Sequence, residues 1–290
     1  MRNENEIKIR DNDINMRIIK HNYGESLCHY TSISALYNIL QNRELWLGNT
    51  ATMNDTSEIK YFLEKMQIAI QNDICPEKLN ICNCFFDSVF KRIDNEYPFA
   101  ISFSRLKDNA AQWERYADSA KGVCIEFNTK KIMSLFYYSN GCLLFNEVFY
   151  GMNAKKHKHY QILMDYFNSN QLNGFSTETG EIDNLIACAY LHKHESFCTE
   201  SEVRLCNLWN HTIDESKISF ELINGRIRKI LKISLNKLCN KEEFDFEDLI
   251  DRIVIAPRSE QTIEELQEYI YNNGMHKLAK KLSRSDCPLR

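Results

Sequence analysis

The chain has 290 residues, of which 43% are hydrophobic and 26% are charged, and its formal net charge is -4 at pH 7. This composition is typical of a globular chain that buries one large core or two small ones. The slightly acidic balance gives no indication of nucleic acid as a partner. Every apolar run falls short of the roughly 20 residues that span a bilayer, so we expect no membrane anchor.

Eleven cysteines are scattered among apolar residues. Their odd number and the lack of a signal peptide favour reduced, buried thiols in a cytoplasmic protein over a disulfide framework. The low content of proline (4) and glycine (9) fits an AT-rich bacterial genome. Residues 1–22 are polar and predict a loosely held N-terminal arm. Residues 23–290 contain no repeat or linker and predict a single domain with helical insertions.

The first predicted element is a strand at 27–30 that carries a histidine. Side chains alternate along a strand, so Leu27 and His29 share one face. A helix follows, which Thr31 or Ser32 can cap. Its apolar positions fall at i, i+3, i+4 and i+7, the spacing of one helical stripe. These positions are Ile33, Leu36, Tyr37 and Leu40. A capped core helix beside a satisfied histidine is the structural alternative to a ligand-binding strand.

A second helix is predicted from residue 54, where Asp55 and Glu58 can form a capping box. Its apolar stripe is Ile59, Phe62, Leu63, Met66 and Ile70. Alternation of apolar and polar residues then predicts half-buried strands at 99–104 and 122–127, with a short helix over 112–116 between them. The remaining expected elements are a helix at 183–194, strands at 201–209, 229–235 and 252–255, and a helix at 262–272. Strands and helices without regular βαβ alternation indicate an α+β sheet fold.

The strand near residue 200 carries the strongest candidate chemistry. On an extended chain, Glu200, Glu202 and Arg204 share one face while Val203 and Leu205 share the other. Two carboxylates at one site push each other's pKa values apart, and a neighbouring arginine counters that effect. A solvated strand face braced by an ion pair is the alternative.

Two further pairs of side chains are candidates for ligand contacts. Ser102 and Ser104 share one face of the strand at 99–104, where a polar outer face is the alternative. Trp113 and Tyr116 share one face of the short helix, where ordinary helix packing is the alternative.

One segment offers an alternative metal site. His192 and His194, with Cys198 nearby, are residue types that bind zinc. An i, i+2 spacing does not bring side chains together on a helix, so we expect no metal. The basic run at 155–160 indicates a solvated loop, with a local nucleic-acid contact as the alternative.

The order of these segments resembles an uncharacterised bacterial domain family. Its members carry, in order, an HYTS-type start, NDxxE, SFS, WxxYA, GxCIEF, KH and ExExR. The matching segments here are 29–32, 54–58, 102–104, 113–117, 122–127, 193–194 and 200–204. That family is in turn similar to the His-Tyr-Glu type of the ADP-ribosyltransferase superfamily. The shared features are a histidine ending the first strand, serines on the second and a glutamate starting a later one.

The resemblance implies an ADP-ribosyltransferase-like split sheet, mixed or antiparallel, with peripheral helices and NAD as the substrate. It assigns the catalytic role to Glu202, with Glu200 as a general base for the acceptor and His29 fixing the dinucleotide. We expect His29 and Glu202 to lie on neighbouring central strands and to face one cleft. The implied NAD-contacting residues are His29, Tyr30, Thr31, Ser102, Ser104, Trp113, Tyr116 and Arg204, with Trp113 and Tyr116 alternatives for stacking on nicotinamide.

Two functional classes follow from this resemblance. The first is an NAD-consuming enzyme, either a transferase that modifies a protein, nucleic acid or small molecule, or a glycohydrolase, in the manner of a toxin or phage-defence effector. The second is a non-catalytic module that binds ADP-ribose or a nucleotide on the same scaffold, or an interaction module. The sequence names neither the acceptor nor the oligomeric state, because loops decide acceptors within such superfamilies.

Overall fold

The computed structural model describes residues 24–50, 57–95, 98–137, 143–169, 180–207, 215–223 and 225–289. The arm expected at 1–22 and the capping segment at Asp55 lie outside these residues. The described residues form two compact units. One, the helical unit, contains those of Met53–Tyr97 and Val148–Cys198, and the other, the sheet unit, contains those of Tyr23–Thr52, Pro98–Glu147 and Thr199–Arg290.

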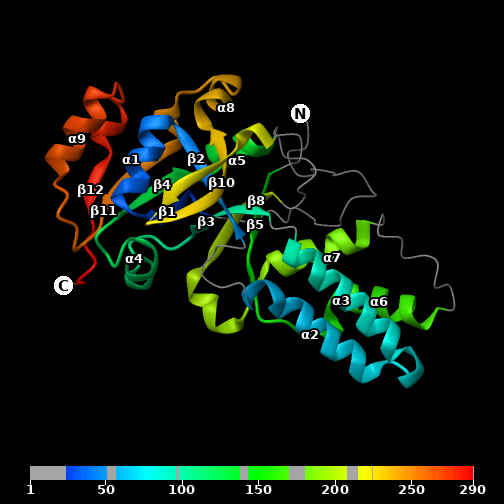
Figure 1. The fold of residues 1–290 in the computed structure, drawn as a ribbon. Coiled ribbons are helices and arrows are strands. Elements are labelled where there is room, and N and C mark those ends of the chain that lie inside the picture. Colours follow the sequence, from blue (N-terminus) through cyan, green and yellow to red (C-terminus); the bar gives the residue numbers. More distant parts are fainter. Residues whose placement is uncertain are drawn as a thin grey trace, which may run out of the picture. The chain divides into compact units, whose positions relative to one another are not determined.

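The sheet unit is built on a ten-stranded sheet in the described part of the chain (Figure 1). The main path runs β12-β11-β4-β1-β3-β2-β10-β9, and β8 joins it by pairing with β3 and β5. Within this sheet the β11–β12 pair is parallel and the other described pairs are antiparallel. The strands are β1 (Ser26–Thr31), β2 (Glu44–Asn49), β3 (Phe99–Ser104), β4 (Val123–Asn128), β5 (Leu144–Glu147), β8 (Glu202–Asn207), β9 (Ile218–Ile223), β10 (Arg226–Ser234), β11 (Ile250–Ile255) and β12 (Leu282–Arg284). This sheet with its flanking helices confirms the α+β class.

Strand β3 is the branching point of the sheet. β8 pairs with β3 along its whole length. On the other edge of β3, β1 pairs at one end, Cys28 opposite Ser104, and β2 pairs at the other end, Gly48 opposite Ala100. β1 and β2 therefore diverge along β3, and the sheet is forked there.

Helices cover both faces of this sheet. On one face, α1 (Ile33–Asn42), α5 (Thr129–Tyr137), α8 (Leu235–Lys241) and α9 (Ile263–Asn272) contribute to the main apolar core. On the other face, α4 (Ala110–Tyr116) packs on β1, β4 and β11 (Figure 1). Residues 123–127 of β4 are consequently all buried, so the expectation of a half-buried strand is wrong for β4.

Local capping resolves one alternative left open by the sequence. The Ser32 hydroxyl accepts a hydrogen bond from the backbone N–H of Ala35 at 3.1 Å, so Ser32, and not Thr31, caps α1. Asn109 caps α4 in the same way, accepting from the N–H groups of Ala111 and Gln112.

Gly122 is a position where the backbone of β1 approaches too closely for a side chain. A Cβ at Gly122 would lie 2.1 Å from the Thr31 carbonyl oxygen. We expect Gly122→Ala to lower the free energy of unfolding by at least about 2–3 kcal/mol, because a backbone strand must shift. Urea unfolding measures this loss. Gly48→Ala is the matched control, since a Cβ there meets nothing within 4 Å. Equal stability of the two variants would contradict the argument.

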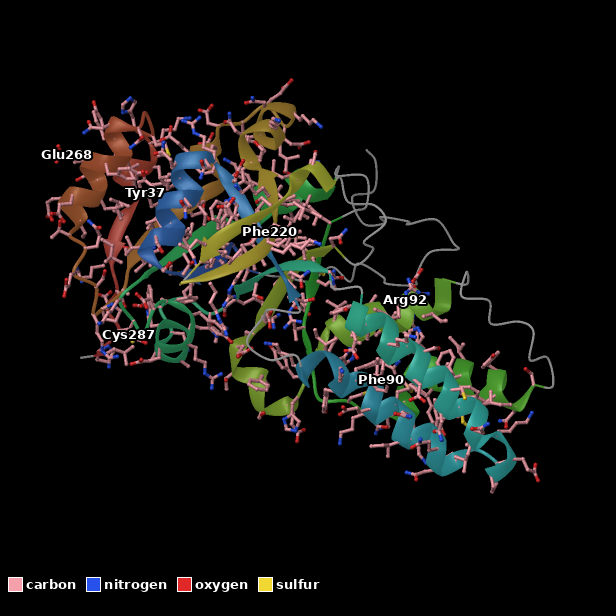
Figure 2. The ribbon with its side chains drawn as sticks, viewed as in Figure 1. Tyr37, Phe90, Arg92, Phe220, Glu268 and Cys287 are labelled. Carbon is pink, nitrogen blue, oxygen red and sulfur yellow. The ribbon has the colours of Figure 1, made fainter. Side chains whose placement is uncertain are left out.

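The helical unit consists mainly of four helices in its described part, with the short parallel strands β6 (Phe149–Tyr150) and β7 (His192–Lys193) (Figure 1). The helices are α2 (Ser57–Asp73), α3 (Leu79–Asn95), α6 (Lys158–Asn168) and α7 (Gly180–Tyr190). The stripe predicted for α2 is confirmed, because all five of its residues are buried. An ion pair of 2.5 Å between Arg92, labelled in Figure 2, and Asp183 joins α3 to α7.

The helix expected over 183–194 ends earlier than predicted. α7 stops at Tyr190, and His192 and Lys193 then pair with Phe149 and Tyr150 as strand β7. Short 3₁₀ turns lie at Pro76–Lys78, Ala154–Lys156, Glu195–Glu200, Glu215–Lys217, Phe246–Leu249 and Leu278–Lys280. Among the described helices, none is long and apolar enough to cross a membrane.

Candidate functional site

Glu202 is the first residue of β8 and is held by two side chains on the same sheet face. The Ser102 hydroxyl, from the neighbouring strand β3, donates a 2.5 Å hydrogen bond to Glu202 Oε1. Arg204 donates from Nε to Oε1 at 2.5 Å and from Nη2 to Oε2 at 3.2 Å. Glu202 is only 5% exposed, whereas Ser102 is exposed. The carboxylate therefore lies just below a surface hydroxyl and is fixed by charge-assisted bonds.

Glu200 does not continue that strand face, so the expected row of three side chains is wrong. It ends the 3₁₀ turn Glu195–Glu200, and Ser201 follows with φ of 45°, a left-handed conformation that breaks the extended alternation. Its carboxylate turns to α4 instead. Glu200 Oε1 accepts from the Tyr116 hydroxyl at 2.5 Å and from Arg115 Nη1 at 3.3 Å.

The two serines of β3 tie both glutamates to one place. Ser102 binds the Glu202 carboxylate, and the Ser104 hydroxyl donates to the Glu200 carbonyl oxygen at 2.7 Å. Gln112 Nε2 also donates to that carbonyl, at 3.3 Å. Both serines share one strand face, as predicted. Ser104 is buried, so the alternative of a polar outer face does not apply to it.

His29 meets this cluster through the backbone of Ser102. Its Nδ1 lies 2.9 Å from the Ser102 carbonyl oxygen, and because a carbonyl only accepts, Nδ1 carries the proton. Its ring lies 5.7 Å from that of Phe103, on the face that His29 shares with Leu27. The side chain of Glu202 lies on the opposite face. The expectation of adjacent strands facing one cleft is wrong, because β3 lies between β1 and β8 and strand alternation separates the two side chains.

The half-buried position of His29 predicts a pH effect on stability. Burial lowers the pKa of His29, and the bond to the Ser102 carbonyl opposes part of that shift. Between the folded pKa and the ordinary value of about 6.5, the unfolded chain binds more protons at this residue. The free energy of unfolding should thus fall as the pH drops through this window. Urea unfolding at several pH values gives the free energy of unfolding as a function of pH. This free energy should depend less on pH for His29→Gln than for the parent. Parallel curves would contradict this role.

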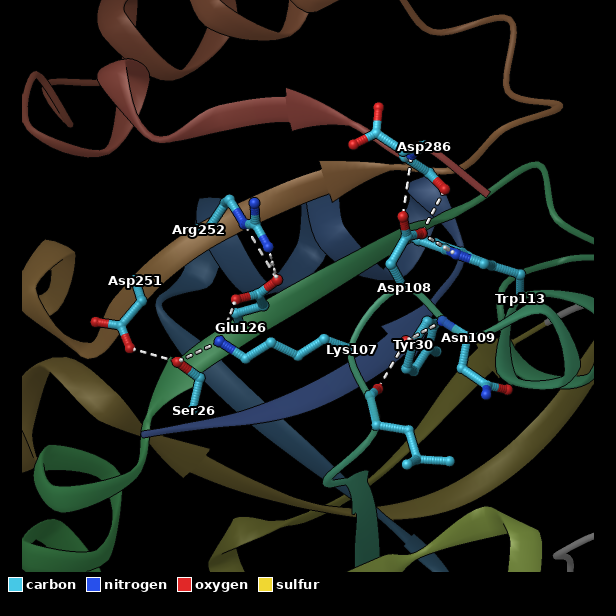
Figure 3. Close-up of polar contacts among 12 residues, drawn as sticks. Ser26, Tyr30, Lys107, Asp108, Asn109, Trp113, Glu126, Asp251, Arg252 and Asp286 are labelled. Carbon is cyan, nitrogen blue, oxygen red and sulfur yellow. Dashed lines mark hydrogen bonds and ion pairs between the residues drawn. The ribbon is translucent and has the colours of Figure 1, made fainter. Parts of the chain in front are cut away.

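Tyr30 and Trp113 belong to the apolar core between α4 and the sheet (Figure 3). The Tyr30 hydroxyl donates to the Leu106 carbonyl oxygen at 2.8 Å and accepts from the Asn109 backbone N–H at 3.1 Å. Burial raises the pKa of Tyr30, which keeps the phenol neutral. Trp113 is fully buried, contacts Tyr30 edge-on at 4.8 Å, and donates from Nε1 to Asp108 at 2.7 Å. Neither ring presents a face to a ligand, and the packing alternative holds for Trp113.

Tyr116 is the aromatic side chain of α4 that reaches the surface, with 38% of the residue exposed. Thr31 lies at the end of β1, where it pairs with Val123 on the side of β4. The structure therefore gathers six of the expected residues into one cluster and holds His29 against it. The six are Glu200, Glu202, Arg204, Ser102, Ser104 and Tyr116.

Gln112 and Arg115, which are not among the residues predicted from the sequence, bind Glu200 from α4. The helical spacing places them on one face with Tyr116, because Gln112 lies three residues before Arg115 and four before Tyr116. Only the non-local docking of α4 on residue 200 gives that spacing its meaning.

His192 and His194, the alternative zinc ligands considered from the sequence, make different local contacts. His192 Nδ1 lies 2.7 Å from the Cys188 carbonyl oxygen, whereas His194 Nδ1 lies 2.9 Å from the Ser196 hydroxyl. The two rings therefore serve separate local contacts.

Comparison with known proteins gives one family match, over part of the chain. Residues 112–205 match a family described as "Protein of unknown function (DUF2971)". This segment contains Tyr116, Glu200, Glu202 and Arg204, and it begins after Ser104. No curated protein and no solved structure matched the chain.

Proposed function

We propose that this protein cleaves NAD, as an ADP-ribosyltransferase or an NAD glycohydrolase, with Glu202 as the catalytic carboxylate. The observation that carries the proposal is a glutamate at the start of β8, fixed by Ser102 of the adjacent strand in a forked, mostly antiparallel sheet. This is the arrangement that the resemblance to the His-Tyr-Glu type implies for the glutamate and the serines.

Cleavage of the nicotinamide–ribose bond is favoured by a carboxylate at the position of Glu202. Breaking the bond between nicotinamide N1 and ribose C1′ sends the bonding pair to nicotinamide and leaves oxocarbenium character on the sugar. A carboxylate that binds the neighbouring 2′-hydroxyl gains strength in that transition state. Ser102 and Arg204 hold Glu202 in one orientation, which spares reorganisation during the reaction.

The residues around Glu202 take roles that follow from their contacts. Tyr116, a partly exposed residue next to Glu200, would stack on the cationic nicotinamide. Glu200 acts as the general base. It takes the proton from the acceptor, or from water, while the oxygen of the acceptor or water forms its bond to C1′. His29 acts as a positioning residue, because its Nδ1–H is bound to the Ser102 backbone.

One observation favours a second candidate, a non-catalytic module that binds ADP-ribose or a nucleotide. Both oxygens of Glu202 are engaged by Arg204, and the residue is almost fully buried. If the ion pair between Glu202 and Arg204 remains intact when a ligand binds, the Glu202 carboxylate contributes to stability or to binding and not to catalysis.

Incubation of the purified chain with NAD, with and without cell lysate, separates these functions. Nicotinamide release is followed by chromatography. Release without lysate indicates a glycohydrolase, and release that depends on lysate together with label transfer from NAD indicates a transferase. Calorimetric binding of ADP-ribose without release under either condition would support the binding module. Growth arrest on expression in bacteria, relieved by Glu202→Gln, would support a cytoplasmic toxin or phage-defence role.

A further inference from the structure

Two histidines and a cysteine of the helical unit approach one another closely. His157 precedes α6, His159 lies in its first turn, and Cys188 lies in α7. One ligand atom from each of the three lies within 4.8 Å of the other two. The Nδ1 atoms of His157 and His159 are 3.4 Å apart, and Cys188 Sγ is 3.9 Å from His159 Nδ1. Three potential metal ligands therefore lie around one point.

These separations are close to the edges of a tetrahedral coordination shell. Zinc binds imidazole nitrogen at about 2.0–2.1 Å and thiolate sulfur at about 2.3 Å, so tetrahedral ligand atoms lie about 3.3–3.6 Å apart. The separations of 3.4 and 3.9 Å need to change by only a few tenths of an ångström, and that between His157 and Cys188, which is within 4.8 Å, needs to shorten by at most about 1.3 Å. Side-chain rotation supplies such a change without moving the helices.

The donor set selects the class of ion. Two imidazoles and a thiolate favour zinc and similar transition metals over magnesium or calcium, which prefer oxygen. Burial lowers the pKa of His157 to about 4 and that of His159 to about 3, so both rings are neutral at pH 7. Burial also raises the pKa of the Cys188 thiol to about 11. A bound metal would displace the thiol proton to solvent as the metal–sulfur bond forms.

Neighbouring groups hold this cluster in place. His192 Nδ1 binds the Cys188 carbonyl oxygen at 2.7 Å, on the residue that carries the sulfur. The ring of Phe62 lies edge-on to that of His157 at 5.0 Å. Such supporting contacts orient ligands and limit access of water to a metal.

We infer that the helical unit binds one zinc-class divalent ion through His157, His159 and Cys188, with water as the fourth ligand. The ion links the start of α6 to α7, the next helix along the chain, with His159 and Cys188 29 residues apart. The site lies in the unit that does not contain Glu202, and the inference does not depend on the proposed NAD chemistry. In this proposal the basic run at 155–160 is a metal-binding turn, with His157 and His159 directed towards Cys188.

Cobalt titration of the full chain, after removal of metals with EDTA, tests this site. Thiolate coordination to Co²⁺ gives a charge-transfer band in the near ultraviolet, and we expect it to saturate at one ion per chain. Cys188→Ser should abolish the band. Cys84→Ser, which removes an exposed thiol of α3 in the same unit, should leave it unchanged. A band that survives Cys188→Ser, or no saturable band in the parent, would overturn the inference.

A second variant and a second measurement guard against misfolding. Without metal, His157 Nδ1 accepts from the His159 backbone N–H at 3.4 Å, and a metal ion bound at Nδ1 would replace that hydrogen bond. His157→Asn keeps a good capping residue and removes the imidazole, so the fold measured by circular dichroism should remain. Its affinity for Co²⁺ should fall by at least about tenfold. Mutation of a residue that only supports a metal ligand already lowers affinity by about that factor, and His157 is a ligand itself. Zinc at about 100 times its Kd should raise the Tm of the parent by about 5–10 °C. An unchanged affinity and an unchanged Tm would also overturn the site.

Discussion

Glu202→Gln is expected to lower nicotinamide release by about 10²–10³ while NAD binding is retained. Glutamine keeps the shape of the side chain and can still accept from Ser102, but it lacks the negative charge that stabilises an oxocarbenium. Release is measured by chromatography under saturating NAD, and binding by calorimetry. Near-normal release by the folded variant would move the catalytic role to Glu200 or remove the enzyme proposal.

The buried pair of Glu202 and Arg204 requires a control for stability. Removing one partner leaves a buried charge without compensation, which can cost about 3–5 kcal/mol. Glu126→Gln is the matched control, because Glu126 is a buried carboxylate of the same unit that is bound by Arg252 and Lys107 (Figure 3). We expect Glu126→Gln to lower stability but to keep turnover per folded molecule. Equal losses of turnover in both variants would show a general structural effect.

The parts of the fold that are set by local periodicity were predictable from the sequence. The strand expected at 99–104 has the bounds of β3, and the stripe of α2 is fully buried. Ser102 and Ser104 were correctly placed on one face for the same reason. Such elements depend on alternation and helical spacing, which each segment carries by itself.

The errors concern contacts between segments that are far apart in the sequence. The position of His29 relative to Glu202 depends on β3 entering between β1 and β8, which no pattern within either strand encodes. Glu200 left the expected strand face because Ser201 adopts a left-handed conformation, and serine gives no sequence signal for it.

In the helical unit, the charge of a segment does not predict which of its side chains are buried. The run at 155–160 was interpreted as a solvated loop because three lysines dominate its composition. Lys155 is indeed largely exposed and pairs with Asp73, but His159 is almost fully buried beside Cys188. A mixed run can thus place its lysines outward and its histidines inward, and only the packing of α7 reveals which.

Alanine substitutions at Trp113 and Tyr116 should separate core packing from ligand stacking. Trp113→Ala is expected to lower the free energy of unfolding by about 3–5 kcal/mol, because it empties a fully buried site and removes the bond to Asp108. Its effect on NAD affinity should be small in the folded molecules.

Tyr116→Ala should show the opposite pattern, since this ring is partly exposed and lies beside Glu200. We expect NAD binding to weaken by about 0.5–1.5 kcal/mol beyond the loss of simple packing. The free energy of unfolding should fall by less than in Trp113→Ala, because the main loss is the hydrogen bond to the buried Glu200 carboxylate. Tyr116→Phe keeps the ring and loses only the hydroxyl bound to Glu200, so it should retain most of the affinity if stacking is the cause. Calorimetric titration of the three folded variants with a non-hydrolysable NAD analogue decides between these roles. If Tyr116→Ala binds the analogue as tightly as the parent, the nicotinamide pocket lies elsewhere and Tyr116 serves only to hold Glu200.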